Sequence, residues 1–185
     1  MTHLVGIAGS LRSGSFNLSL LKAAARLVPE DVSLEIAPIH EIPLYNADLE
    51  RDVGVPAPVS SLQDRIAAAD GLILATPEYN GSVPGVLKNV LDWLSRPPDQ
   101  IDRVFRGRPV AVIGATPGGL GTALSQAAWL PVLKALGTRL WSGDRLAVSR
   151  AGDLLRADGK VKDSRLEERI TEFMRGFAAF AAVRE

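Results

Sequence analysis

The chain has no cysteine among its 185 residues. This absence excludes disulfide bonds, thiolate metal sites and cysteine nucleophiles, although it says little about the compartment in which the protein works. Any redox chemistry must therefore be borrowed from a bound group.

An excess of charge of one sign is also missing, because 21 basic residues balance 21 acidic ones. No general field draws such a protein toward nucleic acid or an anionic membrane, so the expected partners are small molecules. The sequence shows no run long enough to span a membrane and no signal-peptide pattern. We therefore expect a soluble, cytoplasmic protein, and the length and 46% hydrophobic content predict one domain over residues 1–185.

Several catalytic patterns are absent. His3 and His40 have no neighbours at metal-binding spacing, so no metal site is predicted, and the G-x-S-x-G motif of a serine hydrolase does not occur. Gly9–Phe16 has two glycines spaced as in a nucleotide phosphate loop, but it lacks the lysine that reaches the outer phosphates. Its glycines also miss the spacing of a dinucleotide-binding loop. Another anion must therefore be considered for this segment.

What is present is an alternation of apolar, strand-like runs and helical stretches. The expected strands are 4–8, 32–37, 71–75, 110–115 and 138–147, and the expected helices are 16–28, 60–69, 84–96, 120–136 and one that opens with a capping box of Ser164 and Glu167. Residues 39–58 read as irregular up to the second helix. This order predicts a three-layer α/β fold, with a five-stranded parallel sheet and helices on both faces.

In such a fold, ligands bind beyond the carboxyl ends of the parallel strands. Three loops are expected at that edge. They read GSLRSGSFN (9–17), TPEYNGSVPG (76–85) and ATPGGLGT (115–122).

The first loop offers groups that bind a terminal phosphate. Ser10, Ser13 and Ser15 carry hydroxyls, Arg12 carries a fork of donors, and the start of the helix adds backbone N–H groups. The alternative is that Ser15 only caps the helix and Arg12 is a solvated surface charge. The position after the first strand favours the phosphate, whereas Asn17 could either cap locally or bind the ligand.

The second loop can lay backbone groups along the edge of a planar heterocycle, with Tyr79 packed beside it. The alternative is an ordinary strand-to-helix turn with Asn-Gly chemistry. Glu78 has no paired base, histidine or metal ligand nearby in the sequence, so we interpret it as a loop-shaping or backbone-binding residue rather than a general acid.

In the third loop, Gly118 and Gly119 would let backbone approach a ring closely, although a tight turn at a helix start would use the same residues. Trp93, Trp129 and Trp141 lie in apolar stretches and are expected in the core or at an interface.

With these loops in this order, the sequence resembles the flavodoxin-like NADPH-dependent FMN reductases, especially the bacterial quinone and chromate reductases. The resemblance covers nearly the whole chain. It is carried by GSLRSGSFN (9–17) and PEYNGSVPGVLKN (77–89), which closes on LDWL (91–94), and also by IPLYN (42–46).

The resemblance implies that FMN is bound without a covalent link. The first loop would hold its phosphate, the second loop would lie against the isoalloxazine ring, and the third would close the far side. The cofactor-binding residues implied are Ser10, Arg12, Ser15, Phe16, Asn17, Pro77, Glu78, Tyr79, Asn80, Thr116, Gly118 and Gly119.

The resemblance also implies an activity. NADPH or NADH would pass hydride to the flavin N5 and leave, and an electron acceptor would replace it. The acceptors implied are quinones, free flavin, azo compounds, nitroaromatics and chromate. We expect no catalytic side chain, because the flavin itself carries the electrons.

The sequence departs from the family pattern at one place. Members of this branch often have an arginine shortly after the third loop, where this chain reads Gly121–Leu124, so any contact that the arginine makes between subunits is in question. The resemblance still implies a homodimer or homotetramer, and the helices that contain Trp93 and Trp129 could form the contact or face the core.

Two other functions are possible for an FMN-binding chain, a non-enzymatic electron carrier and a redox-sensing module. Flavodoxin-type carriers have a Thr-rich phosphate loop and are usually acidic, whereas this chain has Arg12 and no net charge. The preference for NADPH over NADH is left open. Arg103, Arg106 and Arg108 precede the fourth strand, and a solvated surface cluster is favoured there over a site for the 2′-phosphate.

Overall fold

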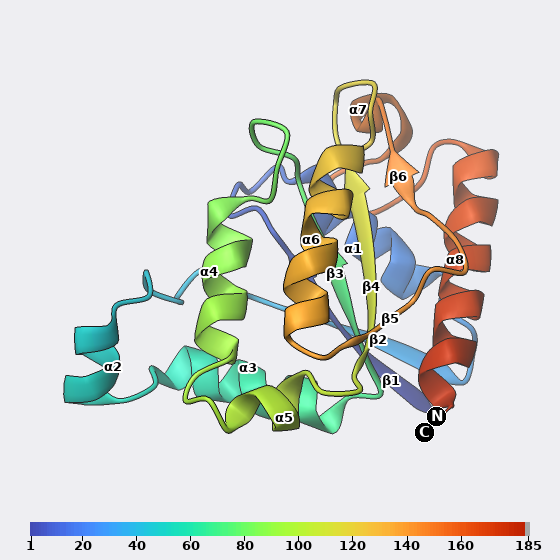
Figure 1. The fold of residues 1–185 in the computed structure, drawn as a ribbon. Helices are drawn as coiled ribbons and strands as arrows, with labels where there is room; N and C mark the ends of the chain where they lie inside the picture. Colours follow the sequence, from blue (N-terminus) through green and yellow to red (C-terminus); the bar gives the residue numbers. More distant parts are fainter. Residues whose placement is uncertain (184–185) are drawn as a thin grey trace.

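The computed structural model describes residues 1–183, so the last two residues of the domain expected over 1–185 lie outside the described residues. A parallel sheet runs in the order β2-β1-β3-β4-β5 (Figure 1). Its strands are β1 (Thr2–Ala8), β2 (Val32–Ala37), β3 (Gly71–Ala75), β4 (Pro109–Ala115) and β5 (Arg139–Leu140). This is the flavodoxin-like strand order, and it confirms the predicted fold class.

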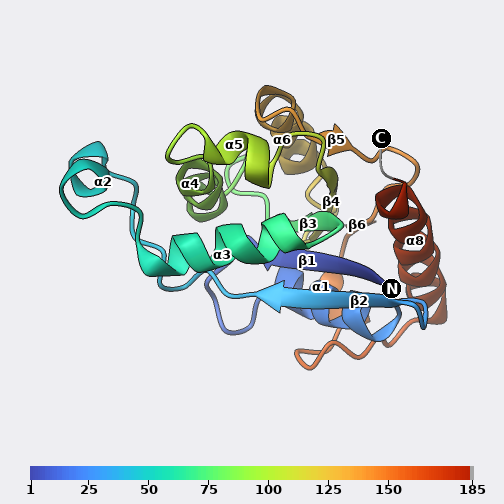
Figure 2. The same cartoon turned by 90° about the horizontal axis from the view of Figure 1, so that it is seen from below.

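Helices cover both faces of the sheet (Figures 1 and 2). Leu4 and Ala8 of β1 pack toward α1 (Phe16–Arg26) and α8 (Ser164–Ala182). Val5 and Ile7 alternate with them and pack on the other face, which is covered by α3 (Ala57–Ala68), α4 (Gly85–Leu94), α5 (Gln100–Val104) and α6 (Ala123–Ala135). Strands covered on both faces account for the nearly continuous apolar runs in the sequence.

The tryptophans belong to this packing. Trp93 and Trp129 are fully buried in the cluster on the α4 and α6 face, so both helices turn these residues toward the core. Of the helices described over residues 1–183, none combines the length and the apolar character that a membrane span requires.

The last strand and its extension, expected over 138–147, form two short strands with a break between them. β5 pairs with the start of β4, and β6 (Ala147–Val148) pairs with its end. Between them Trp141 packs its indole against Phe173 of α8, with ring centroids 4.6 Å apart. Gly143 passes so close to this indole that a Cβ would lie 2.7 Å from its Nε1. The break between β5 and β6 therefore coincides with the half-buried Trp141, which packs on α8 while its N still donates to Val110 O at 2.9 Å.

The starts of two helices show how caps set their boundaries. Ser15 caps α1, because its Oγ accepts a hydrogen bond from Leu18 N at 3.2 Å. The predicted capping box of Ser164 and Glu167 is wrong, because Asp163 is the N-cap of α8 and accepts from Leu166 N at 2.8 Å. The carboxylate of Asp163 meets the positive end of the helix, which favours this earlier start.

Three short helices were not predicted. α2 (Ala47–Val53) lies in the segment expected to be irregular, and α5 and α7 (Ala151–Leu154) fall between predicted elements. α2 has no buried residue and extends away from the sheet (Figure 1). Helices this short have no apolar periodicity to detect. A local cap marks the start of α2, because Asn46 Oδ1 accepts from Asp48 N at 2.9 Å, whereas α5 and α7 have no side-chain cap.

The prediction of a solvated arginine cluster is correct for Arg103 and Arg106, which are exposed, but wrong for Arg108. Arg108 is half-buried and donates to backbone carbonyls of α3 and α5. The acceptors are Ala69 O, Ala67 O at 3.3 Å, Val104 O at 3.2 Å and Arg103 O at 3.2 Å. Burial lowers the pKa of this guanidinium, and its role is to join the carboxyl ends of two helices.

Candidate functional site

The three predicted loops meet at one pocket beyond the carboxyl ends of β1, β3 and β4. The pocket has a volume of about 310 Å³. Its lining residues are Ser10, Arg12, Ser15, Phe16, Asn17, Pro77, Glu78, Tyr79, Ala115, Thr116 and Pro117. Asn80, Gly118 and Gly119 belong to the same loops but do not line the pocket, whereas Ala115 and Pro117 line it without having been predicted.

Larger cavities lie elsewhere. One of about 470 Å³ lies on the outer surface of α8. Two others have volumes of about 470 and 490 Å³. The first is at the amino ends of the strands and includes Arg106 and Arg108, whose guanidinium groups already bind Asp102 and backbone carbonyls. The second runs along α6 beside Leu130 and Trp141 and is mostly apolar. None of them brings together loops at the carboxyl ends of the strands, so the pocket of about 310 Å³ is the better ligand site.

The first loop presents donors to this pocket. The Ser15 hydroxyl accepts from Leu18 N, which leaves its own hydrogen to donate. The N–H groups of Phe16 and Asn17, in the first turn of α1, have no acceptor within residues 1–183. Such N–H groups at a helix start form an anion site together with the hydroxyl. Ser15 thus both caps the helix and lines the pocket.

Arg12 is exposed and lies beside these donors. Its Nη2 donates to Gly14 O at 2.8 Å, and its guanidinium carbon is 5.4 Å from the centroid of the Phe16 ring. The Ser10 hydroxyl accepts from Arg12 N at 3.4 Å. The remaining guanidinium N–H groups are available to an anion at this loop.

Asn17 connects the first loop with the third. Its Nδ2 donates to Ala115 O at 3.0 Å, and its Oδ1 accepts from Ala115 N at 2.9 Å. The side chain is buried, so this pair fixes the start of α1 against the end of β4. Ser15, and not Asn17, caps α1. The second amide hydrogen of Asn17 is therefore available to a ligand.

The second loop ends in a small hairpin. Tyr79 N donates to Ser82 O at 3.2 Å, and Ser82 N donates to Tyr79 O at 3.0 Å. Asn80 and Gly81 form the tip with φ values of 51° and 70°, as the Asn-Gly turn chemistry requires. Because the hairpin uses both backbone groups of Tyr79, contacts with a ring edge would fall to the backbone of Pro77, Glu78 and Asn80.

Glu78 binds backbone N–H groups, in agreement with its interpretation from the sequence as a backbone-binding residue. Its Oε2 accepts from Leu124 N at 2.9 Å and from Ser125 N at 3.3 Å, both in the first turn of α6. The second loop is therefore attached to the helix that follows the third loop.

The third loop is held by its own side chain and by the α7 segment. Thr116 Oγ1 accepts from Gly118 N at 3.2 Å, and Gly118 O accepts from Arg150 N at 3.0 Å. A Cβ at Gly119 would meet no atom within 4 Å, so packing inside the chain does not require this glycine. The open space instead fits close approach of a ligand to backbone.

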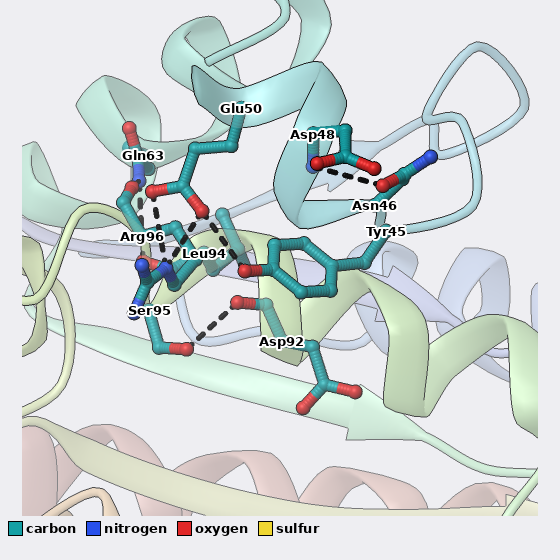
Figure 3. A network of polar contacts seen from close by, with 9 residues as sticks. All are labelled: Tyr45, Asn46, Asp48, Glu50, Gln63, Asp92, Leu94, Ser95 and Arg96. Atoms are coloured by element: carbon teal, nitrogen blue, oxygen red, sulfur yellow. Dashed lines mark hydrogen bonds and ion pairs between the residues drawn. The ribbon is translucent and has the colours of Figure 1, made fainter. Parts of the chain in front are cut away.

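The segment after β2 is fastened to α4 beyond the pocket (Figure 3). Tyr45 OH donates to Glu50 Oε2 at 2.9 Å, and Arg96 Nε donates to the same oxygen at 2.9 Å. Tyr45 N donates to Asn89 Oδ1 at 2.7 Å. The hydrogen bond from Arg96 holds the pKa of Glu50 below its usual value, and donation to Glu50 raises the pKa of Tyr45.

Neither histidine lines the pocket, although His40 contacts the first loop. His3 contacts Ser33 Oγ at 3.1 Å and Glu35 at 3.3 Å, and His40 is exposed, with Nε2 3.3 Å from Leu11 O. Residues 1–183 contain no group of three or more His, Asp or Glu side chains that could hold a metal ion.

A family model described as NADPH-dependent FMN reductase matches residues 2–153. The chain belongs to this family. It is 43% identical over 169 residues to an NAD(P)H-dependent FMN reductase of Pseudomonas aeruginosa, covering 91% of this chain and 89% of the relative. It is 38% identical over 174 residues to a 2-hydroxy-1,4-benzoquinone reductase of a Burkholderia species, covering 94% and 93%.

A solved structure gives the same result for the fold. The flavoenzyme NAD(P)H:(acceptor) oxidoreductase FerB from Paracoccus denitrificans superposes with a TM-score of 0.88 and 34% identity, covering 98% of this chain and 97% of that one. Membership of the FMN reductase family makes the protein an oxidoreductase that uses FMN and NAD(P)H.

The residues present fit FMN. The first loop supplies a hydroxyl, two free helix N–H groups and a guanidinium, a donor set suited to a phosphate monoester. The second loop brings Pro77 and Glu78 to the pocket and the third brings Thr116 and Pro117, and their backbone suits the edge of a flat ring.

Proposed function

We propose that the protein transfers hydride from NAD(P)H, through non-covalently bound FMN, to quinones in a ping-pong sequence. The observation that carries the proposal is the pocket formed by all three loops at the carboxyl edge of the sheet. The quinone reductase activity in the name of the Burkholderia relative supports this class of acceptor.

In this proposal each loop has its own task. Ser10, Arg12 and Ser15, with the N–H groups of Phe16 and Asn17, bind the phosphate. The second loop, through Pro77, Glu78 and Asn80, meets the edge of the ring, and Thr116, Gly118 and Gly119 close the other side. The half-exposed ring of Tyr79 flanks the opening.

FMN, when bound, supplies the two-electron chemistry that links the donor to the acceptor. The chain supplies orientation and the local field, and no side chain is assigned to proton transfer. A cytoplasmic location stays a prediction.

Acceptors beyond quinones, namely free flavin, azo compounds, nitroaromatics and chromate, belong to the same proposal. Arg12 and Glu78 are the charged side chains among the residues that line the pocket. Both are assigned to the cofactor or to the helix of α6, so few groups are left to select one acceptor over another.

We also propose that the chain forms a homodimer or homotetramer. Leu120 and Leu124 are 67% and 51% exposed where the third loop enters α6, close to the pocket. Their exposure supports a contact there, whereas Trp93 and Trp129 are unavailable because they are buried. Light scattering should give a mass of at least twice the 19.7 kDa of the chain; a monomer mass would contradict this part of the proposal.

Steady-state kinetics tests the reaction. Initial rates with varied NADPH or NADH at several fixed concentrations of a benzoquinone should give parallel double-reciprocal lines. Intersecting lines would contradict the ping-pong sequence. Very slow reduction by both nicotinamides would instead favour an electron carrier or a redox sensor.

A further inference from the structure

Helix α6 begins without a cap of its own. The residue at its N-cap position, Thr122, has φ 64° and ψ 28°, which is the left-handed region, and it makes no side-chain capping bond. Its Oγ1 instead accepts from Gln126 Nε2 at 3.2 Å. A capping Ser or Thr normally has an extended backbone that aims its oxygen at the helix N–H groups, so Thr122 cannot perform this role.

Glu78 supplies the missing cap from the second loop. Its carboxylate accepts hydrogen bonds from Leu124 N and Ser125 N, at 2.9 and 3.3 Å, in the otherwise unsatisfied first turn. A negative charge at this end of a helix is also favoured by the helix dipole. The carboxylate and the positive end of α6 therefore form one electrostatic pair.

This pair is held rigidly at the pocket. Thr76 is the first residue of the second loop and is fully buried, and its hydroxyl lies 2.8 Å from Ser125 Oγ. The same hydroxyl accepts from Trp129 Nε1 at 2.9 Å. The second loop cannot shift against α6 without breaking these buried hydrogen bonds. They therefore hold Glu78 in place at the start of α6.

The charge of Glu78 then bears on any ligand of the second loop. A flavin that takes up two electrons and one proton gains one negative charge. A nearby carboxylate disfavours that gain, whereas the uncapped end of a helix favours it. Without Glu78, the positive end of α6 would stabilise the reduced flavin. With Glu78 in place, the negative carboxylate opposes reduction.

We propose that Glu78 is a positioning residue that caps α6 and, by its charge, lowers the reduction potential of FMN bound in this pocket. The inference rests on the proposed function, because it requires the ring of FMN to lie against the second loop.

Glu78→Gln separates charge from position, because an amide oxygen can still accept from the helix N–H groups. The matched control is Glu35→Gln, which removes the same charge from β2, where Glu35 pairs with Arg65 and does not line the pocket. The reduction potential is measured by anaerobic equilibration with a dye of known potential, and the Kd for oxidised FMN by quenching of flavin fluorescence.

For Glu78→Gln we expect a Kd for oxidised FMN within about threefold of wild type, and binding of reduced relative to oxidised FMN strengthened about tenfold. For a two-electron couple this corresponds to a potential about 30 mV higher. Glu35→Gln should leave the potential unchanged. Ser82→Lys adds a positive charge to the exposed hairpin of the second loop and removes no hydrogen bond, because only the backbone of Ser82 is bonded there. It should raise the potential in the same direction and serves if Glu78→Gln does not fold.

A Glu78→Gln protein with the wild-type potential would overturn the inference, as would an equal rise in Glu35→Gln. If Glu78→Gln does not fold, an unchanged potential in Ser82→Lys would overturn the inference. A wild-type protein that does not bind FMN would contradict the proposed function instead, so the two failures are distinguishable.

Discussion

The side-chain amide of Asn17 hydrogen-bonds to both backbone groups of Ala115, which lies 98 residues later in the chain. This pair joins the helix after the first loop to the strand before the third. Asn17→Ala would leave a buried N–H and a buried C=O of Ala115 unsatisfied, and we expect it to lower the free energy of unfolding by about 3 kcal/mol. Urea unfolding followed by circular dichroism measures this loss.

Asn46→Ala is the matched control, because Asn46 only caps the exposed helix α2. Its expected cost is about 1 kcal/mol. Equal losses in the free energy of unfolding for the two substitutions would contradict the role given to the Asn17–Ala115 hydrogen bonds.

Arg12 gives the clearest prediction for cofactor binding. Arg12→Ala should weaken FMN binding by about 1.5–3 kcal/mol, the contribution of a hydrogen bond between charged groups. Fluorescence titration measures the change in Kd. Arg51→Ala removes an arginine whose partners are Asp48 and Asp52 on α2, and it should leave the Kd unchanged. Unaltered affinity in Arg12→Ala would refute the phosphate contact.

Gly114 lies at a close approach within the fold. A Cβ there would lie 1.8 Å from Thr122 Oγ1 and 2.6 Å from the backbone oxygen of Thr76. Gly114→Ala should therefore cost more than about 4 kcal/mol and leave little folded protein. At Gly85, where a Cβ meets no atom within 4 Å, Gly→Ala should stabilise by about 0.5 kcal/mol. Thermal melts compare the two, and a wild-type melt for Gly114→Ala would show that the backbone can adjust.

The link between Glu50 and Arg96 predicts a pH dependence. The hydrogen bond from Arg96 holds the folded-state pKa of Glu50 below its ordinary value of 4.5. The contribution of Glu50 to stability is therefore present above that pH and is lost as the pH falls through the lowered pKa. At pH 7, Glu50→Gln should unfold at a lower temperature than wild type. The difference in unfolding temperature between the two proteins should disappear in the acid range below pH 4.5. A gap independent of pH would mean that the charge of Glu50 is not what holds the segment.

Sequence patterns predicted the parts of the fold that depend on local periodicity. The four long parallel strands were found because burial on both faces leaves short, nearly continuous apolar runs. The helices that pack on them were found because burial of one face leaves a helical period. α2 was missed because none of its residues is buried, and the break after Leu140 was missed because the packing of Trp141 on α8 is a tertiary contact.

The pocket, too, could be predicted from the sequence only in part. Its three loops were predicted from strand order, but the partners of Asn17 and Glu78 lie 98 and 46 residues away along the chain. The left-handed backbone of Thr122, which leaves α6 without a local cap, has no signature in the residue itself, since Thr is an ordinary capping residue. These tertiary hydrogen bonds could be found only from the structure.

The most direct test of the proposed function is an absorbance spectrum of the purified protein with FMN, followed under anaerobic conditions by NADPH and then by a quinone. The account predicts bands of bound flavin that bleach with NADPH and return with the quinone. Flavin that binds but does not bleach would contradict the reductase, and flavin that does not bind would contradict the assignment of the pocket.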